Sequence, residues 1–343
     1  MKIQIKVFLV QMALAVLLSG CQWQSSNNIE DDWKPYKSRF VAEDGRVIDT
    51  GNGNMSQSES QGYGLIMAVK ADDKETFKQI WQWTKINLQV RKDNLFMWRR
   101  RPETALSDED KNNATDGDII IAWALLEAAT KWQQQAYDQE AFKILNDIKR
   151  KLIVQKNGLT IILPGEYGFQ SQDTTTINLS YWVYPAFKVF SVRDADPVWQ
   201  ELVAGGLALL QQARYGRWQL PPDWLEIGND KSMVPAKNVR FGYDAVRVPL
   251  YLVLADIDND VLAPFAEYWG YYQGYTPAWI DLKENVMDSY GADSGIRAIK
   301  QITLAALKKT EPAAFDSVTE AQDYYSATLL LLSKLSYRQF IKR

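Results

Sequence analysis

Apolar residues recur at spacings of three and four along most of the chain after Trp33, the pattern of helices that bury one face. Ser, Thr or Asp often opens these runs, as expected at helix N-caps. Alternation typical of strands is rare, and its best example is the short stretch 158–163. The pattern predicts an all-α domain with helices around the runs 65–69, 77–83, 119–132, 142–152, 198–210, 245–255, 262–272, 299–307 and 327–335.

No Pro- or Ser-rich linker divides the chain after Trp33, so residues 33–343 are expected to form one domain. Such a length accommodates roughly a dozen helices with their connections. No sequence repeat is visible, and an exact solenoid is therefore unsupported. A closed ring of helical hairpins is compatible with the pattern, but periodicity alone does not select it.

The N-terminal region has the pattern of an export signal. Lys2 and Lys6 precede an apolar stretch, residues 7–18, that is too short to span a bilayer. The sequence Leu-Ser-Gly-Cys at 18–21 matches a bacterial lipoprotein cleavage box, and Cys21 is the only cysteine. We therefore expect a signal peptide at 1–20, and a lipidated Cys21 followed by a polar tether at 21–32. The alternative is an ordinary signal peptide with a chance cysteine.

If Cys21 is acylated, its lipid chains bind the membrane by burying hydrocarbon. Gln22 after the cysteine resembles the sorting signal of outer-membrane lipoproteins. The expected location is therefore the periplasm or the cell surface, at the outer membrane.

The composition narrows the chemistry. A net charge of −3 gives no electrostatic case for binding nucleic acid. The chain has no histidine, which excludes Ser-His-Asp and Cys-His catalysis and the common zinc sites. Acid–base chemistry must therefore use Asp, Glu, Tyr or Lys. No metal motif is visible, and we expect no metal and no cofactor.

Acidic residues open several of the predicted helices. Glu59 precedes the run 65–69, Asp116 and Asp118 precede the run 119–132, and Asp244 lies three residues before Arg247. Each acid taken singly could be a helix cap or a first-turn acid that suits the helix dipole. The last pair could be an ordinary surface ion pair.

Together these acids suggest catalysis. Three acids at the starts of three helices could meet at one end of a helical array, where their pKa values would move apart. Glycoside hydrolysis needs such a pair, one carboxyl protonated and one ionised. Gly62 and Gly64 weaken the helix that follows Glu59 by about 1 kcal/mol each, but they allow close approach of another backbone or a ligand.

The same stretches resemble the motifs of glycoside hydrolase family 8, an endoglucanase family. Ser-Glu-Ser-Gln-Gly-Tyr-Gly at 58–64 is a near-complete match, and Ala-Thr-Asp-Gly-Asp at 114–118 and Tyr-Asp-Ala-Val-Arg-Val-Pro at 243–249 resemble two further motifs. Asn-Leu-Ser-Tyr at 178–181 and Pro-Asp-Trp at 222–224 are also similar to family sequences. The resemblance extends from about Trp33 to the C-terminus.

The resemblance implies an (α/α)6 barrel and an inverting endo-β-1,4-glucanase. It implies that Glu59 is the general acid, that Asp244 is the general base, and that Asp116 binds and distorts the sugar at the scissile bond. It further implies that Arg247 orients Asp244 and that Tyr181 positions the water. The residues expected to bind substrate are Trp98, Tyr181, Arg247, Tyr243, Tyr63 and Asp118.

Several other aromatic and basic residues are less clearly placed. Trp123 and Trp132 lie within an apolar helix and are expected in the core. Trp224, Tyr324 and Tyr325 are candidates for either the cleft or the core. The run Arg99–Arg101 is expected on a solvated loop.

The substrate and the partners remain open to alternatives. A chitosanase, a xylanase or a mixed-linkage glucanase of the same family is compatible with the motifs. From another class, the protein could be a non-catalytic polysaccharide-binding lipoprotein of an export complex, or a purely structural helical lipoprotein. We expect a monomer that acts on nascent or exported cellulose, possible partners being a cellulose synthesis or export complex.

Overall fold

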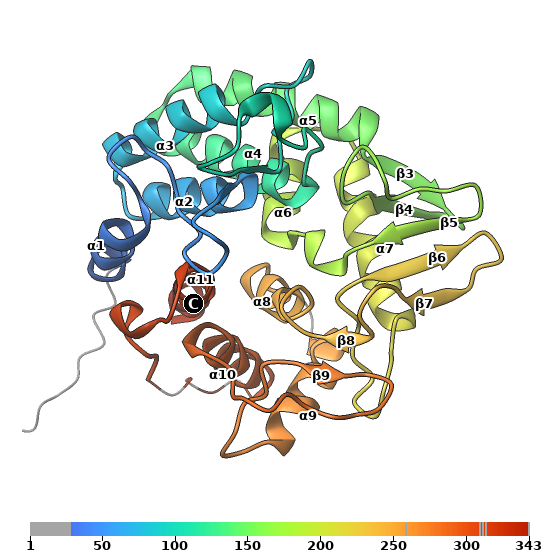
Figure 1. Ribbon diagram of the computed structural model, residues 1–343. Coiled ribbons are helices and arrows are strands. Elements are labelled where there is room, and N and C mark those ends of the chain that lie inside the picture. Colours follow the sequence, from blue (N-terminus) through green and yellow to red (C-terminus); the bar gives the residue numbers. More distant parts are fainter. Residues whose placement is uncertain (1–28, 258, 309, 311, 313, 342–343) are drawn as a thin grey trace, which may run out of the picture.

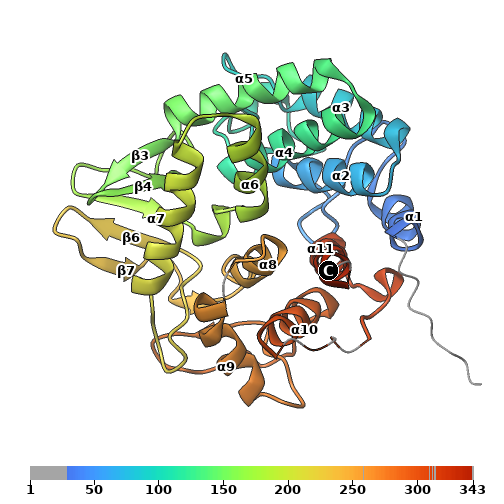
Figure 2. The ribbon, with the colours of Figure 1, turned by 180° about the vertical axis from the view of Figure 1, so that it is seen from behind.

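The computed structural model describes residues 29–341 apart from 258, 309, 311 and 313. Helices dominate this part of the chain and form a ring, in which α3, α5, α7 and α9 lie outside α2, α4, α6 and α8 (Figures 1 and 2). The described helices are α1 (Ile29–Phe40), α2 (Ser58–Lys70), α3 (Lys74–Asn87), α4 (Thr115–Trp132), α5 (Gln135–Lys151), α6 (Tyr184–Arg193), α7 (Val198–Gln212), α8 (Arg247–Leu254), α9 (Ala263–Tyr271), α10 (Ser294–Lys308) and α11 (Tyr324–Ile341).

Burial explains which helices lie inside the ring. Every residue of α8 is buried, and so are almost all residues of α2 and most of α4. In contrast, α3, α5 and α10 bury one face and expose the other. A helix that is apolar on all sides belongs in a protein interior, whereas an amphipathic helix covers it. Each inner helix therefore packs against neighbouring inner helices on one side and against outer helices on the other.

The all-α prediction is confirmed, and each of the nine predicted runs overlaps a helix of the structure. Two helices were missed. The first, α1, is polar overall and contains Pro35, and the second, α6, is short and begins with Tyr184 and Pro185. The helix expected from Glu59 onward begins at Ser58, and Ser58–Gly64 is almost entirely buried although its sequence is polar or glycine-rich.

Short antiparallel strands connect the helices. The hairpin of β3 (Ile153–Lys156) and β4 (Leu159–Ile162) confirms the strand predicted at 158–163. The other described strands are β1 (Ser56–Gln57) paired with β2 (Arg99–Arg100), the sheet β5 (Thr174–Ile177), β6 (Leu225–Gly228) and β7 (Met233–Pro235), and β8 (Arg240–Phe241) paired with β9 (Ile280–Asp281). The register pairs Ser56 with Arg100 and Ile177 with Leu225.

The predicted tether is partly wrong. Residues 29–32 belong to α1, and Asp32 pairs with Lys334 at 2.7 Å and with Arg338 at 2.8 Å. The described part of the domain therefore starts before the predicted boundary at Trp33. The predicted signal peptide, residues 1–20, and the lipidation site Cys21 lie outside the described residues. Within the described part of the chain, no helix is both long and apolar enough to cross a bilayer.

Glycines bring the first two inner helices close together, as predicted for Gly62. A Cβ at Gly62 would lie 2.9 Å from Cγ2 of Ile120, and one at Gly117 would lie 2.7 Å from the backbone nitrogen of Glu59. A Cβ at Gly64 would instead meet the ends of two side chains, Val47 and Ile80. The close approach of α2 and α4 thus depends on glycine in both motifs, and Gly117 was not recognised from the sequence.

These contacts predict different costs for two glycine-to-alanine substitutions. Gly117→Ala should lower the free energy of unfolding by about 1–3 kcal/mol, because its new methyl group meets backbone that cannot move cheaply. Gly64→Ala should cost less, since side-chain ends can shift and alanine favours a helix by about 1 kcal/mol. Urea unfolding of both variants measures the difference. Equal stabilities would show that the close approach of α2 to α4 does not restrict the residue at Gly117.

Candidate active site

The guanidinium group of Arg247 joins the three predicted acids. Its Nη1 donates to Oε1 of Glu59 at 2.8 Å and to Oδ2 of Asp116 at 3.1 Å. Its Nη2 donates to Oδ1 of Asp244 at 2.9 Å and to Oγ of Ser180 at 2.8 Å. Arg247 is only 3% exposed. The structure therefore brings three predicted acids together around one buried cation, the predicted site residue Arg247.

The helix arrangement explains why they meet. Glu59 lies in the first turn of α2, Asp116 in the first turn of α4, and Arg247 begins α8 just after Asp244. Carboxylates are stabilised near helix N-termini by the unpaired N–H groups and the helix dipole. Three clustered acids also repel one another, and Arg247 offsets that repulsion. Bidentate guanidinium geometry suits this bridging better than a lysine would.

The acids differ in their exposure to solvent. The side chain of Asp116 is 1% exposed, that of Glu59 21% and that of Asp244 32%. Burial raises the pKa of Asp116 to about 7, the charge of Glu59 adds to the rise, and Arg247 opposes it. Burial also raises the pKa of Glu59, with Arg247 opposing and Asp244 adding to the rise. These environments favour a protonated Glu59 facing a more solvated Asp244.

Tyr63 lies behind Glu59 and not on an open surface. It is fully buried, and its hydroxyl contacts that of Tyr251 and hydrogen-bonds Glu59. Tyr63 therefore supports the acid from the protein interior, and the structure gives it no exposed surface for a sugar.

Tyr181 and Trp224 stand beside Arg247 and Asp244. The ring of Tyr181 lies 6.2 Å from that of Trp224, and its centroid is 5.9 Å from Cζ of Arg247. Burial raises the pKa of the Tyr181 phenol well above its ordinary value, so this residue remains a neutral donor. Trp224 Nε1 donates to Oδ2 of Asp244 at 3.1 Å. Both aromatic residues therefore belong to the site.

Trp98 is tied to the start of α2 by backbone. The amide of Ser58, one residue before Glu59, donates to the carbonyl of Trp98 at 3.0 Å. The indole is half-buried and donates to Asp110 at 3.1 Å. The guanidinium of Arg99, which was expected on a solvated loop, lies 4.0 Å from the Trp98 ring centroid. The backbone of Trp98 therefore lies beside that of Ser58, the neighbour of Glu59.

Asp118 lies apart from the Arg247 cluster. It is fully buried, and its oxygens accept from the amide of Phe96 at 2.8 Å and from Nδ2 of Asn113 at 2.7 Å. Burial raises its pKa well above the ordinary value. The structure gives Asp118 no surface for substrate, and instead it fixes the segment that leads to Trp98.

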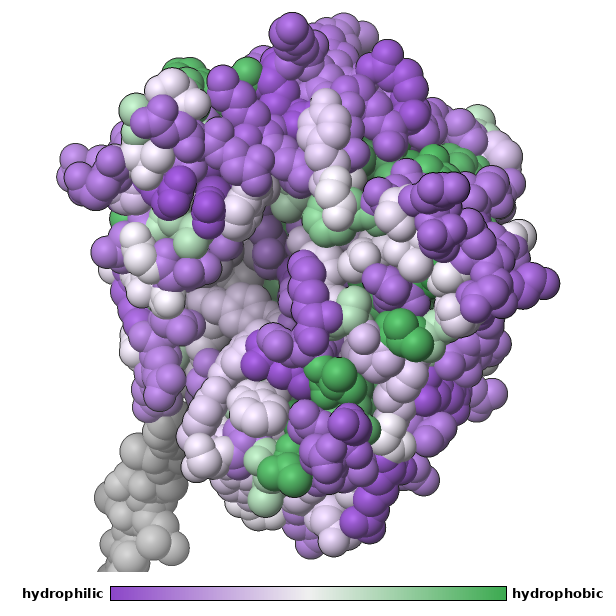
Figure 3. Space-filling model, turned by 45° about the vertical axis from the view of Figure 1, so that its right-hand side comes forward, coloured by the Kyte–Doolittle hydropathy of each residue, from purple (hydrophilic) through white to green (hydrophobic). Residues whose placement is uncertain are grey.

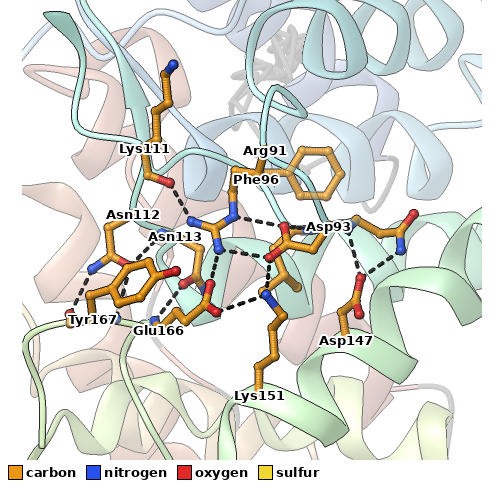
Figure 4. Close-up of polar contacts among 12 residues, drawn as sticks. Arg91, Asp93, Phe96, Lys111, Asn112, Asn113, Asp147, Lys151, Glu166 and Tyr167 are labelled. Carbon is orange, nitrogen blue, oxygen red and sulfur yellow. Dashed lines mark hydrogen bonds and ion pairs between the residues drawn. The ribbon is translucent and has the colours of Figure 1, made fainter.

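An ion-pair network supports the same segment (Figure 4). Arg91 lies between Asp93, at 2.9 Å, and Glu166, while Lys151 reaches the same two acids at 2.6 Å and 2.9 Å. Asp147 accepts from the amide of Asn94 at 2.8 Å. The network was not predicted from the sequence, because its members come from three separate segments and form no motif.

A second group of aromatic residues extends from the segment that carries Asp244. The hydroxyl of Tyr243 lies 3.3 Å from that of Tyr290, which also accepts from Nε1 of Trp279 at 3.2 Å. Sequence reasoning missed Trp279 and Tyr290. The hydroxyl of Tyr325 donates to the carbonyl of Tyr243. Figure 3 shows a hollow on one face of the molecule in which pale side chains of intermediate hydropathy gather, as expected for a cleft with aromatic walls.

The remaining aromatic candidates belong to the packing. Tyr324 is buried, with its ring 6.0 Å from that of Phe40. Trp123 is buried, as expected. Trp132 is half-buried with its ring 5.1 Å from Phe77, and its indole donates to Asp72 at 2.7 Å. No group of acids, cysteines or histidines suited to holding a metal occurs among residues 29–341 as far as they are described.

The arrangement can therefore donate and accept protons at two carboxyls beside an aromatic cleft. Comparisons with known proteins agree with this chemistry. The family model described as glycosyl hydrolases family 8 matches residues 3–339. A probable endoglucanase of Novacetimonas hansenii is 35% identical over 94% of this chain and 97% of its own length, and an endoglucanase of Cellulomonas uda is 38% identical over 86% and 82%.

A solved structure shows the same fold. The endo-β-1,4-glucanase CMCax of Acetobacter xylinum superposes with a TM-score of 0.86 at 35% identity, covering 92% of this chain and 99% of its own. The (α/α)6 barrel implied by the resemblance is thereby confirmed. With three acids gathered on Arg247 and relatives of this similarity, the chain belongs to glycosyl hydrolase family 8 and is an endo-β-1,4-glucanase.

Proposed function

We propose that Glu59 is the general acid and Asp244 the general base of an inverting hydrolysis. The observation that carries this proposal is the binding of both carboxylates by different nitrogens of the Arg247 guanidinium. Burial favours the proton on Glu59, and the greater exposure of Asp244 leaves it access to water. The two carboxyls thus have the unequal environments that inversion requires.

In this mechanism Glu59 gives its proton to the glycosidic oxygen as the bond to the anomeric carbon breaks. A water attacks the other face of the sugar and passes a proton to Asp244. Glu59 becomes a carboxylate in this step, and the hydrogen bond from Arg247 stabilises the new charge. In this proposal Asp116, which shares that nitrogen of Arg247, binds the sugar at the scissile bond, although its side chain is only 1% exposed.

The aromatic residues supply the sugar-binding surfaces in this proposal. The Trp98 ring and the Tyr243 ring lie on segments that adjoin Glu59 and Asp244, and pyranose rings pack their apolar faces on such rings. Tyr181 donates to the attacking water. The endoglucanase relatives support β-1,4-glucan over chitosan, xylan or mixed-linkage glucan as the substrate.

Glu59→Gln tests the acid. The amide keeps the size of the side chain but supplies no transferable proton, so the rate on carboxymethyl cellulose should fall by at least about 100-fold. Binding of cello-oligosaccharides, measured by calorimetry, should remain. In the parent digest, proton NMR should show the α anomer first, because a β bond is inverted.

Three outcomes would contradict these roles. Full activity of Glu59→Gln would mean that another group is the acid. An initial β anomer would exclude inversion. Oligosaccharide binding without turnover in the parent would favour the non-catalytic binding protein.

The raised pKa of Asp116 predicts a pH-dependent stability. Between pH 3.8 and about 7 the folded state holds the proton that the unfolded state releases, so the stability of the parent falls as the pH rises through this window. Asp116→Asn lacks this effect. On going from pH 4.5 to 7.5, it should gain up to about 3 kcal/mol relative to the parent, as judged by urea unfolding. The exposed Asp108→Asn serves as the control, and an equal change in both variants would contradict the assignment.

We propose further that the protein is a lipoprotein of the outer membrane that trims nascent or exported β-1,4-glucan. The support is the Leu-Ser-Gly-Cys sequence at 18–21 together with the endoglucanase family. A tethered hydrolase remains at the site where the polymer leaves the cell, whereas a freely diffusing one does not.

Cys21→Ser tests the tether. Because the thiol is the acylation site, the variant should lose incorporation of labelled palmitate and should leave the membrane fraction for the soluble fraction. Its activity on carboxymethyl cellulose should be unchanged. Membrane association that persists in Cys21→Ser would remove the lipoprotein assignment, and a gene deletion that leaves polymer length and crystallinity unchanged would remove the trimming role.

A further inference from the structure

The backbone that carries Asp244 is held by a second buried acid. Asp223 is only 3% exposed, and its Oδ1 accepts from the amides of Gly242 at 2.9 Å, Asp244 at 3.2 Å and Ala245 at 2.9 Å. Its Oδ2 accepts from Nε of Arg240 at 3.0 Å. One carboxylate thus fixes the turn in which Asp244 stands, just before α8.

Trp224, the residue after Asp223, holds the side chain of Asp244. Trp224 Nε1 donates to Oδ2 of Asp244, while Arg247 donates to Oδ1. The two donors occupy different oxygens, so together they fix the plane of the carboxylate. Each oxygen keeps a second lone pair that can accept from water.

The indole of Trp224 is already engaged by the protein. It stacks on Phe169 with centroids 5.9 Å apart and planes 5° apart, and Nζ of Lys237 lies 3.5 Å from its ring centroid. A sugar that stacked on this ring would have to compete with both side chains. The ring is therefore better placed to aim its N–H than to bind a pyranose.

The backbone at Trp224 is also fixed. Its carbonyl accepts from the amide of Ala236 at 2.8 Å, and the following strand, β6, is the central strand of the three-stranded sheet. An N–H donor attached to such a fixed backbone moves little relative to its acceptor.

We propose that Trp224 is a positioning residue for the general base, and that Asp223 and Trp224 act together on the backbone and the side chain of Asp244. The inference rests on the proposed role of Asp244 as the base. Trp224 does not touch the sugar. It holds Oδ2 of Asp244 so that the remaining lone pair points at the attacking water.

Trp224→Phe tests this role because it keeps an aromatic ring beside Phe169 and removes the N–H donor, together with the pyrrole part of the indole. The expected result is a kcat lower by about 10- to 100-fold with KM within twofold, since a small displacement of a catalytic group has an effect of this size. The acid limb of the kcat/KM profile should also move to higher pH, because a carboxylate that loses a hydrogen bond binds its proton more tightly. The charged and titratable groups that face Asp244 remain unaltered: Arg247, Glu59, Asp223, Tyr181 and Tyr325.

Trp132→Phe is the matched control. It removes the same kind of bond, from an indole to an aspartate, at the far end of α4, about 24 Å along the helix from Asp116. Its kcat and pH profile should equal those of the parent. Circular dichroism and the melting temperature verify that both variants are folded.

Asp244→Asn separates failure of this inference from failure of the proposed base. An active Asp244→Asn variant would show that Asp244 is not the base, and the inference would fall with it. If Asp244→Asn is inactive, unchanged kinetics in Trp224→Phe would overturn the positioning role alone. A raised KM with unchanged kcat would make Trp224 a sugar platform, and a lower kcat without a shift of the acid limb would make its effect merely structural. Both results would overturn the inference.

Discussion

The site depends on one buried cation that three carboxylates share. Removing Arg247 would leave Glu59, Asp116 and Asp244 to repel one another at low dielectric, where an uncompensated buried charge costs several kcal/mol. The guanidinium does not simply cancel the charges. It joins the starts of two inner helices to the turn before a third, so the electrostatic need for a partner also fixes the geometry of the three acidic side chains.

The barrel prepares this arrangement before any substrate arrives. Inner helices buried on all sides place their first turns together, and the loops there carry the aromatic side chains. Much of the surrounding structure restrains these loops, including the network of Arg91, Asp93, Lys151 and Glu166 below the Trp98 segment. Electrostatic catalysis benefits from such groups because they need not reorganise during the reaction.

The sequence predicted the helices well where they carry a long apolar run and poorly where they do not. Thus α4 and α7 follow from periodicity, whereas α1, with its polar composition and Pro35, required tertiary contacts to be recognised. The acids of the site were predictable because each opens a helix within a familiar motif. The sequence could not separate Asp116, which contacts Arg247, from Asp118, which lies two residues further on and points to Phe96.

The closed ring of helices could not be predicted from hydrophobic periodicity, because the same amphipathic helices can pack in several ways. Only the family resemblance predicted it. Residues without a motif, such as Trp279 and Tyr290, were missed because they lie in a loop, 277–291, that pairing of β9 with the distant β8 brings next to Tyr243. The predicted end of the tether failed for a related reason. Asp32 looks like part of a polar linker until its partners near the C-terminus are known.

The backbone hydrogen bond between Ser58 and Trp98 has a consequence for the lengths of the oligosaccharide products. It joins the proposed sugar platform to the residue next to the acid through main-chain atoms, so the two cannot drift apart as loosely held side chains would. In the proposed mechanism, the distance from a glucose unit on the Trp98 ring to Glu59 would then be fixed by main-chain atoms. The bond that is cleaved would lie a constant number of glucose units from the unit on Trp98, so the lengths of the smallest products would be set by the backbone.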